Sequence, residues 1–234
     1  MKEKLLLVAG LLLLTFGISA ADGWKTVEEI SISGTKVKKE TMVFGDVMKM
    51  VNSAANGGNE TIIDLTADQI TLINHFDKTY QVLKLSKYIE FAEQMLKEMT
   101  AQGSINPDKI PPKITYKKGE TESVTLGKGV HYSVAVDGKP YMEVWVAPEL
   151  KDSSLIGFRE KFAKMLPSDL TKYRNIDAKI RDHLSTIGLI VKQIKTPFNP
   201  KLPQSEQTMI LMEKIAMPPK LIVIPDDYVQ KNSK

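Results

Sequence analysis

The side chains best suited to catalysis or metal binding are scattered along this 234-residue chain. Its three histidines, His75, His131 and His183, lie far apart in sequence, and none belongs to the HxH or HExxH patterns that bind zinc. Cysteine is absent, which excludes a cysteine nucleophile. These residues therefore predict no metal site and no cofactor.

Other catalytic motifs are also missing from the sequence. It contains no G-x-S-x-G nucleophile elbow, no P-loop and no dinucleotide fingerprint. The acidic pairs Glu28-Glu29 and Asp226-Asp227 are poor acid–base partners, because neighbouring residues of a strand point to opposite faces. We therefore expect a protein that is not an enzyme. A hydrolase stays open as an alternative, and it would require His131 to meet a serine and an acid in space.

Basic residues gather between positions 158 and 184. They are Arg159, Lys161, Lys164, Lys172, Arg174, Lys179 and Arg181. A solvated helix face accounts for this pattern, and the functional interpretation is docking on anionic membrane lipid or on an acidic partner. The whole chain has a net charge of +4, with acids and bases mixed along it, so we expect no nucleic-acid partner.

The first 21 residues are typical of a secretory signal peptide. Lys2 and Lys4 give a basic start, residues 5–18 are mostly apolar, and Ser19-Ala20-Ala21 offers small residues for cleavage. The apolar run is too short for a transmembrane helix, although an uncleaved N-terminal anchor is the alternative. Because no cysteine could carry a lipid anchor, we expect a soluble periplasmic protein. Residues 22–229 would form a single domain, and residues 230–234 a mobile tail.

Beyond the signal, the sequence predicts runs of strands with helices inserted between them. Apolar alternation and polar turns indicate about nine to eleven strands and two or three helices. Met42, Phe44, Met48 and Met50 recur at period two and indicate one half-buried strand over residues 40–51, with a helix over residues 46–51 as the alternative. Asp137-Gly138 marks a tight hairpin. This order of elements predicts an α+β fold rather than alternating βαβ units.

Three segments show helical spacing. The first begins near Ser86, which we expect to cap it, and ends at Gly103. The second covers residues 153–166 and ends at Pro167, and the third follows Asp169 and ends at Gly188. A closing pair of strands is expected at residues 189–194 and 208–217.

Several short phrases in the sequence resemble a known group of proteins. They are Ile62-Ile63-Asp64-Leu65, Asp77-Lys78-Thr79-Tyr80, Glu143-Val144-Trp145-Val146-Ala147 and Ile224-Pro225-Asp226-Asp227-Tyr228. With the signal peptide and the order of elements, they are similar to exported bacterial proteins related to the LolA/LolB lipoprotein carriers. The resemblance implies a strongly curved, open antiparallel half-barrel whose concave face is covered by helices. In the carriers, that cleft holds the acyl chains of a lipoprotein.

This architecture leads to a set of candidate cleft residues. Binding would be driven by burial of apolar surface, and the methionines would suit an adaptable apolar wall. The candidates are Ile30, Ile32, Phe44, Tyr80, Val82, Val134 and Trp145 on the sheet, with Met95 and Phe162 on the covering helices. A register shift of one residue would move any strand's candidates to the other face.

Two functions follow from this interpretation. The first is a periplasmic binding or carrier protein for a lipid-like or acylated ligand. The alternative is a cell-envelope interaction or assembly module that binds a protein partner through a sheet edge or its basic helices, without a small ligand. A continuous apolar cavity would favour the carrier, and a concave face filled by side chains would favour the interaction module.

Overall fold

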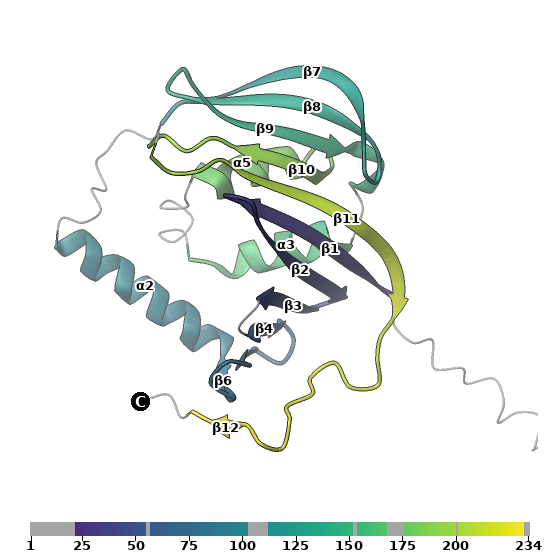
Figure 1. Ribbon diagram of the computed structural model, residues 1–234. Helices are drawn as coiled ribbons and strands as arrows, with labels where there is room; N and C mark the ends of the chain where they lie inside the picture. Colours follow the sequence, from purple (N-terminus) through teal and green to yellow (C-terminus); the bar gives the residue numbers. More distant parts are fainter. Residues whose placement is uncertain are drawn as a thin grey trace, which may run out of the picture.

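The computed structural model of the protein describes residues 22–54, 57–102, 112–151, 154–167, 176–199 and 201–231. Its main element is one open sheet of twelve strands (Figure 1). The strands are β1 (Asp22–Ile32), β2 (Thr35–Phe44), β3 (Val47–Ala54), β4 (Gly57–Asp64), β5 (Gln69–Asn74), β6 (Thr79–Lys84), β7 (Ile114–Val124), β8 (Gly127–Val136), β9 (Lys139–Ala147), β10 (Leu189–Lys195), β11 (Ser205–Ala216) and β12 (Val229–Gln230). The expected open, mostly antiparallel α+β fold is confirmed, with twelve strands rather than nine to eleven.

The sheet consists of two meanders that meet at one seam. Its strand order is β12-β6-β5-β4-β3-β2-β1-β11-β10-β9-β8-β7, so β1 to β6 and β7 to β11 each lie in sequence order. The seam is the antiparallel pairing of β1 with β11, which runs from Asp22 opposite Ala216 to Ile32 opposite Ser205. The N-terminal strand of the described chain therefore lies in the middle of the sheet.

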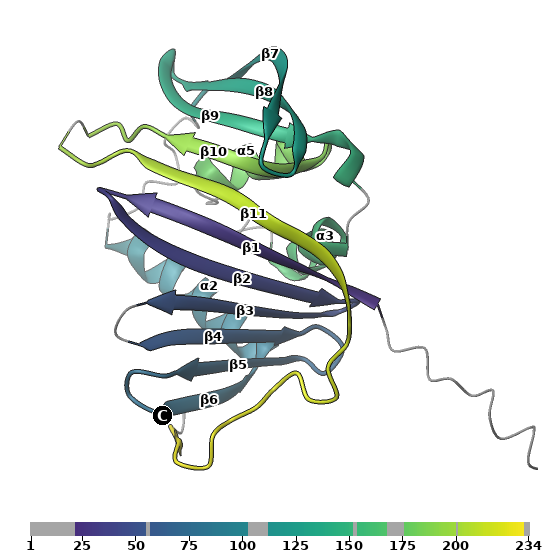
Figure 2. The ribbon, with the colours of Figure 1, turned by 45° about the vertical axis from the view of Figure 1, so that its right-hand side comes forward.

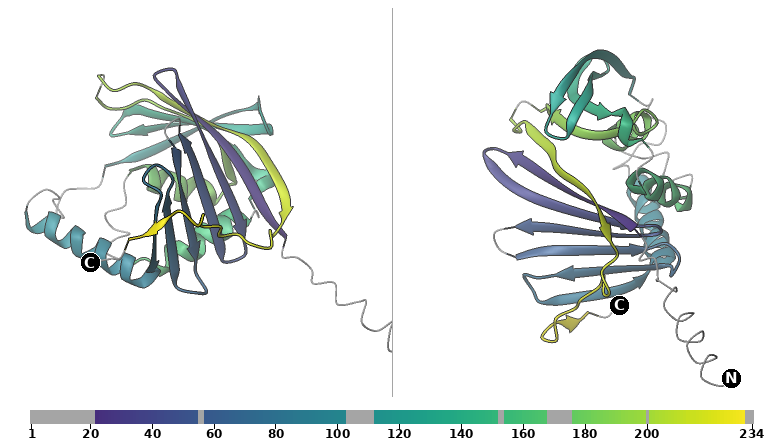
Figure 3. Two further views of the ribbon diagram at one scale, coloured as in Figure 1. Left: turned by 60° about the horizontal axis from the view of Figure 1, so that its bottom comes forward. Right: turned by 90° about the vertical axis from the view of Figure 1, so that its right-hand side faces the viewer.

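Helices cover one face of the sheet, which we call the inner face (Figures 2 and 3). They are α2 (Leu85–Ala101), α3 (Ser154–Met165) and α5 (Ile176–Ser185), and a 3-10 turn, η1 (Pro148–Leu150), follows β9. Leu155, Ile156 and Phe158 of α3 pack into one buried cluster with side chains of β2 to β5. Ile180 and Leu184 of α5 form a second cluster with β8 and β9. The predicted helix over residues 153–166 thus corresponds to α3. The cap proposed at Asp169 lies outside the described residues.

A turn missed in the sequence changes the predicted faces. Residues 40–51 are not one strand, because Gly45 and Asp46 connect β2 to β3 and Gly45 has a φ of 57°, a conformation suited to glycine. Phe44 is paired with Val47, and Val43 with Met48. Phe44 consequently points away from the helices, while Met48 joins the buried cluster on the inner face.

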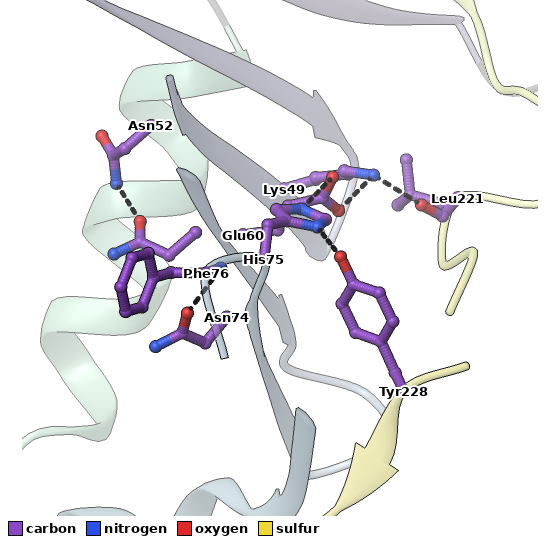
Figure 4. Close-up of polar contacts among 9 residues, drawn as sticks. Lys49, Asn52, Glu60, Asn74, His75, Phe76, Leu221 and Tyr228 are labelled. Atoms are coloured by element: carbon purple, nitrogen blue, oxygen red, sulfur yellow. Dashed lines mark hydrogen bonds and ion pairs between the residues drawn. The ribbon is translucent and has the colours of Figure 1, made fainter. Parts of the chain in front are cut away.

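The C-terminal segment, residues 217–231, crosses the opposite, outer face of the sheet (Figure 2). The Nζ of Lys49 donates to the carbonyl oxygen of Leu221 at 3.3 Å, and Nδ1 of His75 lies 2.7 Å from the hydroxyl of Tyr228 (Figure 4). Lys49 and His75 also contact Glu60, at 2.7 and 3.3 Å. This segment ends in β12, which pairs in parallel with β6.

The segment explains why outer-face side chains are buried where no helix lies. Ile62, Thr71 and Ile73 share that face with Glu60, and each is only 1% exposed. Two residues of the predicted mobile tail are bound to the sheet, because Gln230 lies in β12 and the amide of Lys231 donates to the carbonyl oxygen of Tyr80. The predicted signal peptide and residues 232–234 lie outside the described residues. None of the helices in the described ranges is long and apolar enough to cross a membrane.

Gly188 and Gly157 offer a matched test of the packing. A Cβ at Gly188 would overlap backbone atoms of Ala147 and Pro148, whereas a Cβ at Gly157, within α3, meets no atom within 4 Å. We expect Gly188→Ala to lower the free energy of unfolding by about 1–3 kcal/mol, because β10 must shift from β9. Gly157→Ala should raise it by about 0.5–1 kcal/mol, since alanine favours the helix. Chemical denaturation measures both, and equal effects would contradict the packing described.

Candidate functional site

Helix α2 is anchored to the sheet mainly through its first turns. Leu85 and Ile89 are buried in the main cluster, at 0% and 8% exposure. The predicted Ser86 cap is wrong, because the N-cap position is Lys84 and no side chain caps it. Instead, the carboxylate of Asp68, in the β4–β5 turn, accepts hydrogen bonds from the amide and the hydroxyl of Ser86, at 2.8 and 2.7 Å. These bonds fix the start of α2 to the end of the sheet.

The rest of α2 leaves one apolar flank exposed. Tyr88, Phe91, Met95 and Met99 are 44%, 60%, 46% and 41% exposed, and we call these four side chains the α2 flank. Their spacings of three and four residues place them along one side of the helix, next to its buried stripe. Figures 1 and 3 show that the C-terminal end of α2 runs away from the sheet. The apolar arc of this helix is therefore wider than the sheet covers.

A second feature of the inner face is a polar cavity beneath α3 and α5. It has a volume of about 140 Å3, and its wall includes Glu28 and Lys39 from the sheet and Arg159 and Arg181 from the two helices. Glu28 is only 6% exposed, and its Oε2 lies 3.3 Å from the Nζ of Lys39. That oxygen accepts no hydrogen bond within the described chain. The cavity thus contains a buried carboxylate that is incompletely satisfied.

Two irregularities in the strands border this cavity. The β1–β11 register shifts between Val27 and Glu28, and the β10–β9 register shifts between Ile190 and Lys192. Glu28, Ile190 and Lys192 all belong to the cavity wall. Bulges of this kind redirect side chains and are common beside functional sites.

The two arginines carry positive charge that the described chain does not pair. No hydrogen bond or ion pair joins either guanidinium to another residue in the described part of the chain. Burial lowers the pKa of Arg159, the positive charge of Arg181 lowers it further, and Glu28 raises it. Arg159 and Arg181 also line a second groove, of about 340 Å3, between α3 and α5. The arginines therefore border both hollows.

Five of the nine predicted cleft residues lie on the helix side of the sheet. Ile30 lines the polar cavity, and Ile32 is exposed at the end of β1. Val134 is buried beneath α5, and Phe162 stacks on Phe158 with ring centroids 6.5 Å apart. Met95 belongs to the α2 flank. The structure does not bring these five together into one apolar cleft.

Of the other four predicted cleft residues, three point to the outer face, and Trp145 points away from α5 but packs against the main buried cluster. Phe44 and Val82 are on that face by register, and the hydroxyl of Tyr80 donates to Gln230 of β12. Trp145 is paired with His131, on the opposite face of β8 and β9 from Val134. These predictions failed because of strand register. An error of one residue in the register moves a side chain to the other face of the sheet.

The hydrolase alternative depended on His131, which does meet a serine and an acid. Nε2 of His131 lies 2.6 Å from Oε2 of Glu143, and the hydroxyl of Ser133 donates to the same oxygen at 2.8 Å. The acid thus lies between the two, and the serine is not bonded to the imidazole that would activate it. Within the described ranges, no three His, Cys, Asp or Glu residues form a group able to hold a metal ion.

The burial of Glu28 and the shared hollows of Arg159 and Arg181 were not predicted from the sequence. Glu28 occupies the same face of β1 as Thr26 and Ile30, and a carboxylate at an inward-pointing strand position is a detectable signal. The arginines lie on two helices that follow one another in the chain, and their spacing in sequence does not show that both border one cavity.

Comparisons with known proteins give fold similarities at low identity. No protein-family model matches the sequence, and no curated protein matches it. Similar solved structures include an uncharacterized conserved protein from Thermus thermophilus, with 8% identity, a TM-score of 0.48 and coverage of 96% of this chain and 99% of that one. A LolA superfamily protein from Nitrosomonas europaea has 8% identity, a TM-score of 0.27 and coverage of 90% and 92%.

A third similar structure is MucB in complex with MucA(peri), with 9% identity and a TM-score of 0.38. The match covers 90% of this chain and 56% of the MucB chain, so this chain spans little more than half of that protein. The similar solved structures thus include a LolA superfamily protein, at low identity. All three TM-scores are below 0.5.

The hydrogen bonds between Asp68 and Ser86, which anchor α2, should make the stability of the fold depend on pH in the acid range. Hydrogen bonds from Ser86 hold the pKa of the Asp68 carboxyl below its usual 3.8, so the anchor stabilises the fold above that pH and is lost as pH falls through the lowered pKa. We expect Asp68→Asn to lower the thermal midpoint at pH 7, with the difference from the wild type narrowing below about pH 4. The control Asp226→Asn, which changes an exposed carboxylate, should leave the thermal midpoint as in the wild type at both pH values. A constant difference between pH 7 and pH 2 would contradict the role of this carboxylate.

Proposed function

We propose that this protein is an exported, non-enzymatic binding or carrier protein that holds a lipid-like or acylated ligand against the α2 flank. The observation that carries this proposal is the exposure of Tyr88, Phe91, Met95 and Met99 on one side of a single helix. Exposed apolar surface that is contiguous, rather than scattered singly, is typical of ligand or partner sites. The absence of catalytic motifs in the sequence agrees with a protein that only binds.

The chemistry of the α2 flank suits an acyl chain. Covering apolar surface contributes about 25 cal/mol per Å2, or about 0.8 kcal/mol for each buried methylene. Two of the four side chains are methionines, which adapt to irregular apolar partners, and two are aromatic rings with large contact areas. An acyl chain lying along this side of the helix would bury apolar surface against all four side chains.

The polar cavity is not the place for such a chain. Its volume of about 140 Å3 is below the range of roughly 300–1,000 Å3 that is usual for ligand pockets. The side chains of α3 and α5 fill the inner face on either side of it. We therefore place the apolar part of the ligand at α2, which exposes four large apolar side chains, whereas α3 exposes one such side chain, Met165, among its described residues.

The alternative function is a cell-envelope module that binds a protein partner without a small ligand. The filled inner face beneath α3 and α5 favours it, because an acyl carrier needs open apolar space. An amphipathic segment of a partner could cover the α2 flank as one helix covers another. Peripheral contact with an anionic membrane, through the basic residues of α3 and α5, is compatible with either function.

The first experiment is native mass spectrometry of the mature protein purified from its own periplasm, followed by lipid extraction. A co-purifying acyl species in near-stoichiometric amount would support the carrier. An apo mass, with no uptake of added fatty acid or phospholipid, would reject it in favour of the protein-binding module. Recovery from another compartment would overturn the assignment to the periplasm.

A variant of the α2 flank tests the location of the ligand. We expect Phe91→Ser combined with Met95→Ser to weaken binding of a fluorescent fatty acid by at least tenfold, since each lost side chain removes about 1–2 kcal/mol of apolar contact. Fluorescence titration measures the affinity.

The matched control is Phe76→Ser, which removes a phenylalanine that is 72% exposed in the β5–β6 turn. This control should bind the probe as the wild type does. Equal affinity of all three proteins would show that the ligand, if bound, lies elsewhere.

A further inference from the structure

We infer that Arg159 and Arg181 form a binding site for a phosphate group, at the junction of the polar cavity and the groove between α3 and α5. The site would take the charged end of a ligand rather than its apolar part. It deepens the proposed function, and its assignment to a lipid headgroup rests on that function. The existence of a phosphate-binding site does not depend on the proposed function.

Among the residues that the structure describes, the acids around the cavity form ion pairs with lysines and not with these two arginines. The Nζ of Lys39 lies 3.3 Å from Oε2 of Glu28, and the Nζ of Lys192 lies 3.0 Å from Oε1 of Glu206. Each lysine of the cavity wall thus has its own acid. Within the described residues, no ion pair joins Arg159 or Arg181 to an acid, and Glu28 attracts Arg159 only from a longer range. A doubly charged oxyanion would balance the two positive charges.

Guanidinium groups suit phosphate better than they suit a single acceptor atom. Each presents a planar fork of N–H donors that can bind two oxygens at once, and the charge is retained at any physiological pH. Two forks from separate helices can therefore hold one phosphate from two directions. The pair would otherwise be unfavourable, because two like charges share a partly buried site.

The hollows have the right size and access for this ligand. The cavity of about 140 Å3 has room for several water molecules, and so for one phosphate group. The larger groove, of about 340 Å3, reaches the same two arginines from between the helices. Gln193 and Gln207, on the sheet side of the cavity, are bonded to each other at 2.8 Å and add polar groups to the wall.

Two acids in the groove define the competing interpretation. Glu160 and Asp182 line it together with the arginines, and Asp182 has a polar interaction of its own. Glu28 also attracts Arg159 through the cavity. If these acids were the partners of the arginines, added phosphate would not bind, and titration with phosphate separates the two cases.

Calorimetric titration with inorganic phosphate, at neutral pH and low salt, tests the site in the intact mature protein. We expect saturable binding that Arg181→Met weakens at least tenfold and Arg159→Met abolishes. Lys179→Met removes the same charge from α5 at a position outside both hollows, and it should bind within about twofold of the wild type. Because Arg181 is exposed, its variant should keep the thermal midpoint of the wild type even if Arg159→Met is unstable.

A short-chain phosphatidic acid identifies the source of the phosphate. Tighter binding than inorganic phosphate, lost in Arg181→Met and reduced in the Phe91→Ser, Met95→Ser variant, supports a lipid headgroup. Equal affinity for both probes supports a free phosphate and rejects only the lipid source. No binding of phosphate, or binding that Arg181→Met and Lys179→Met weaken equally, would overturn the site, whatever the fate of the proposed carrier function.

Discussion

The pairing of β1 with β11 is the constraint on which the rest of the molecule depends. All other antiparallel pairs join strands that are neighbours along the chain, with α3 and α5 inserted only between β9 and β10. The β1–β11 seam alone turns two meanders into one sheet, and its ladder connects residues about 180 positions apart. It also brings Glu28 beneath the arginines of α3 and α5. The polar cavity depends on this ladder, because its wall combines residues of β1 and β11 with residues of β10.

The helices on this sheet are of two kinds. Residues of α3 and α5 complete the apolar core, and their arginines border the polar hollows. Only the first turns of α2 belong to the core, and four of its large apolar side chains remain exposed. Charge and apolar surface are thus separated on the same face. The proposed amphiphilic ligand would place its anionic head at one part and its apolar tail at the other.

Local features could be predicted from the sequence, and the arrangement of distant segments could not. Asp137-Gly138 indicated the β8–β9 turn correctly, and both residues have positive φ. The period of the apolar residues located α2 and α3. The Gly45-Asp46 turn was overlooked, and this reversed the face of Phe44, because side chains alternate along a strand. The Arg159–Arg181 site depends on the packing of two helices, which no local pattern encodes.

The two edges of the sheet differ in how they are protected. At one edge, the short strand β12 covers β6 in parallel. At the other edge, β7 is a long strand whose pairing with β8 is interrupted between Lys118 and Thr121, and whose exposed residues include Lys117, Lys118, Glu120 and Glu122. Bulges and charges prevent a foreign strand from extending such an edge. A protein built on a twelve-stranded open sheet therefore carries its own defence against edge-to-edge aggregation.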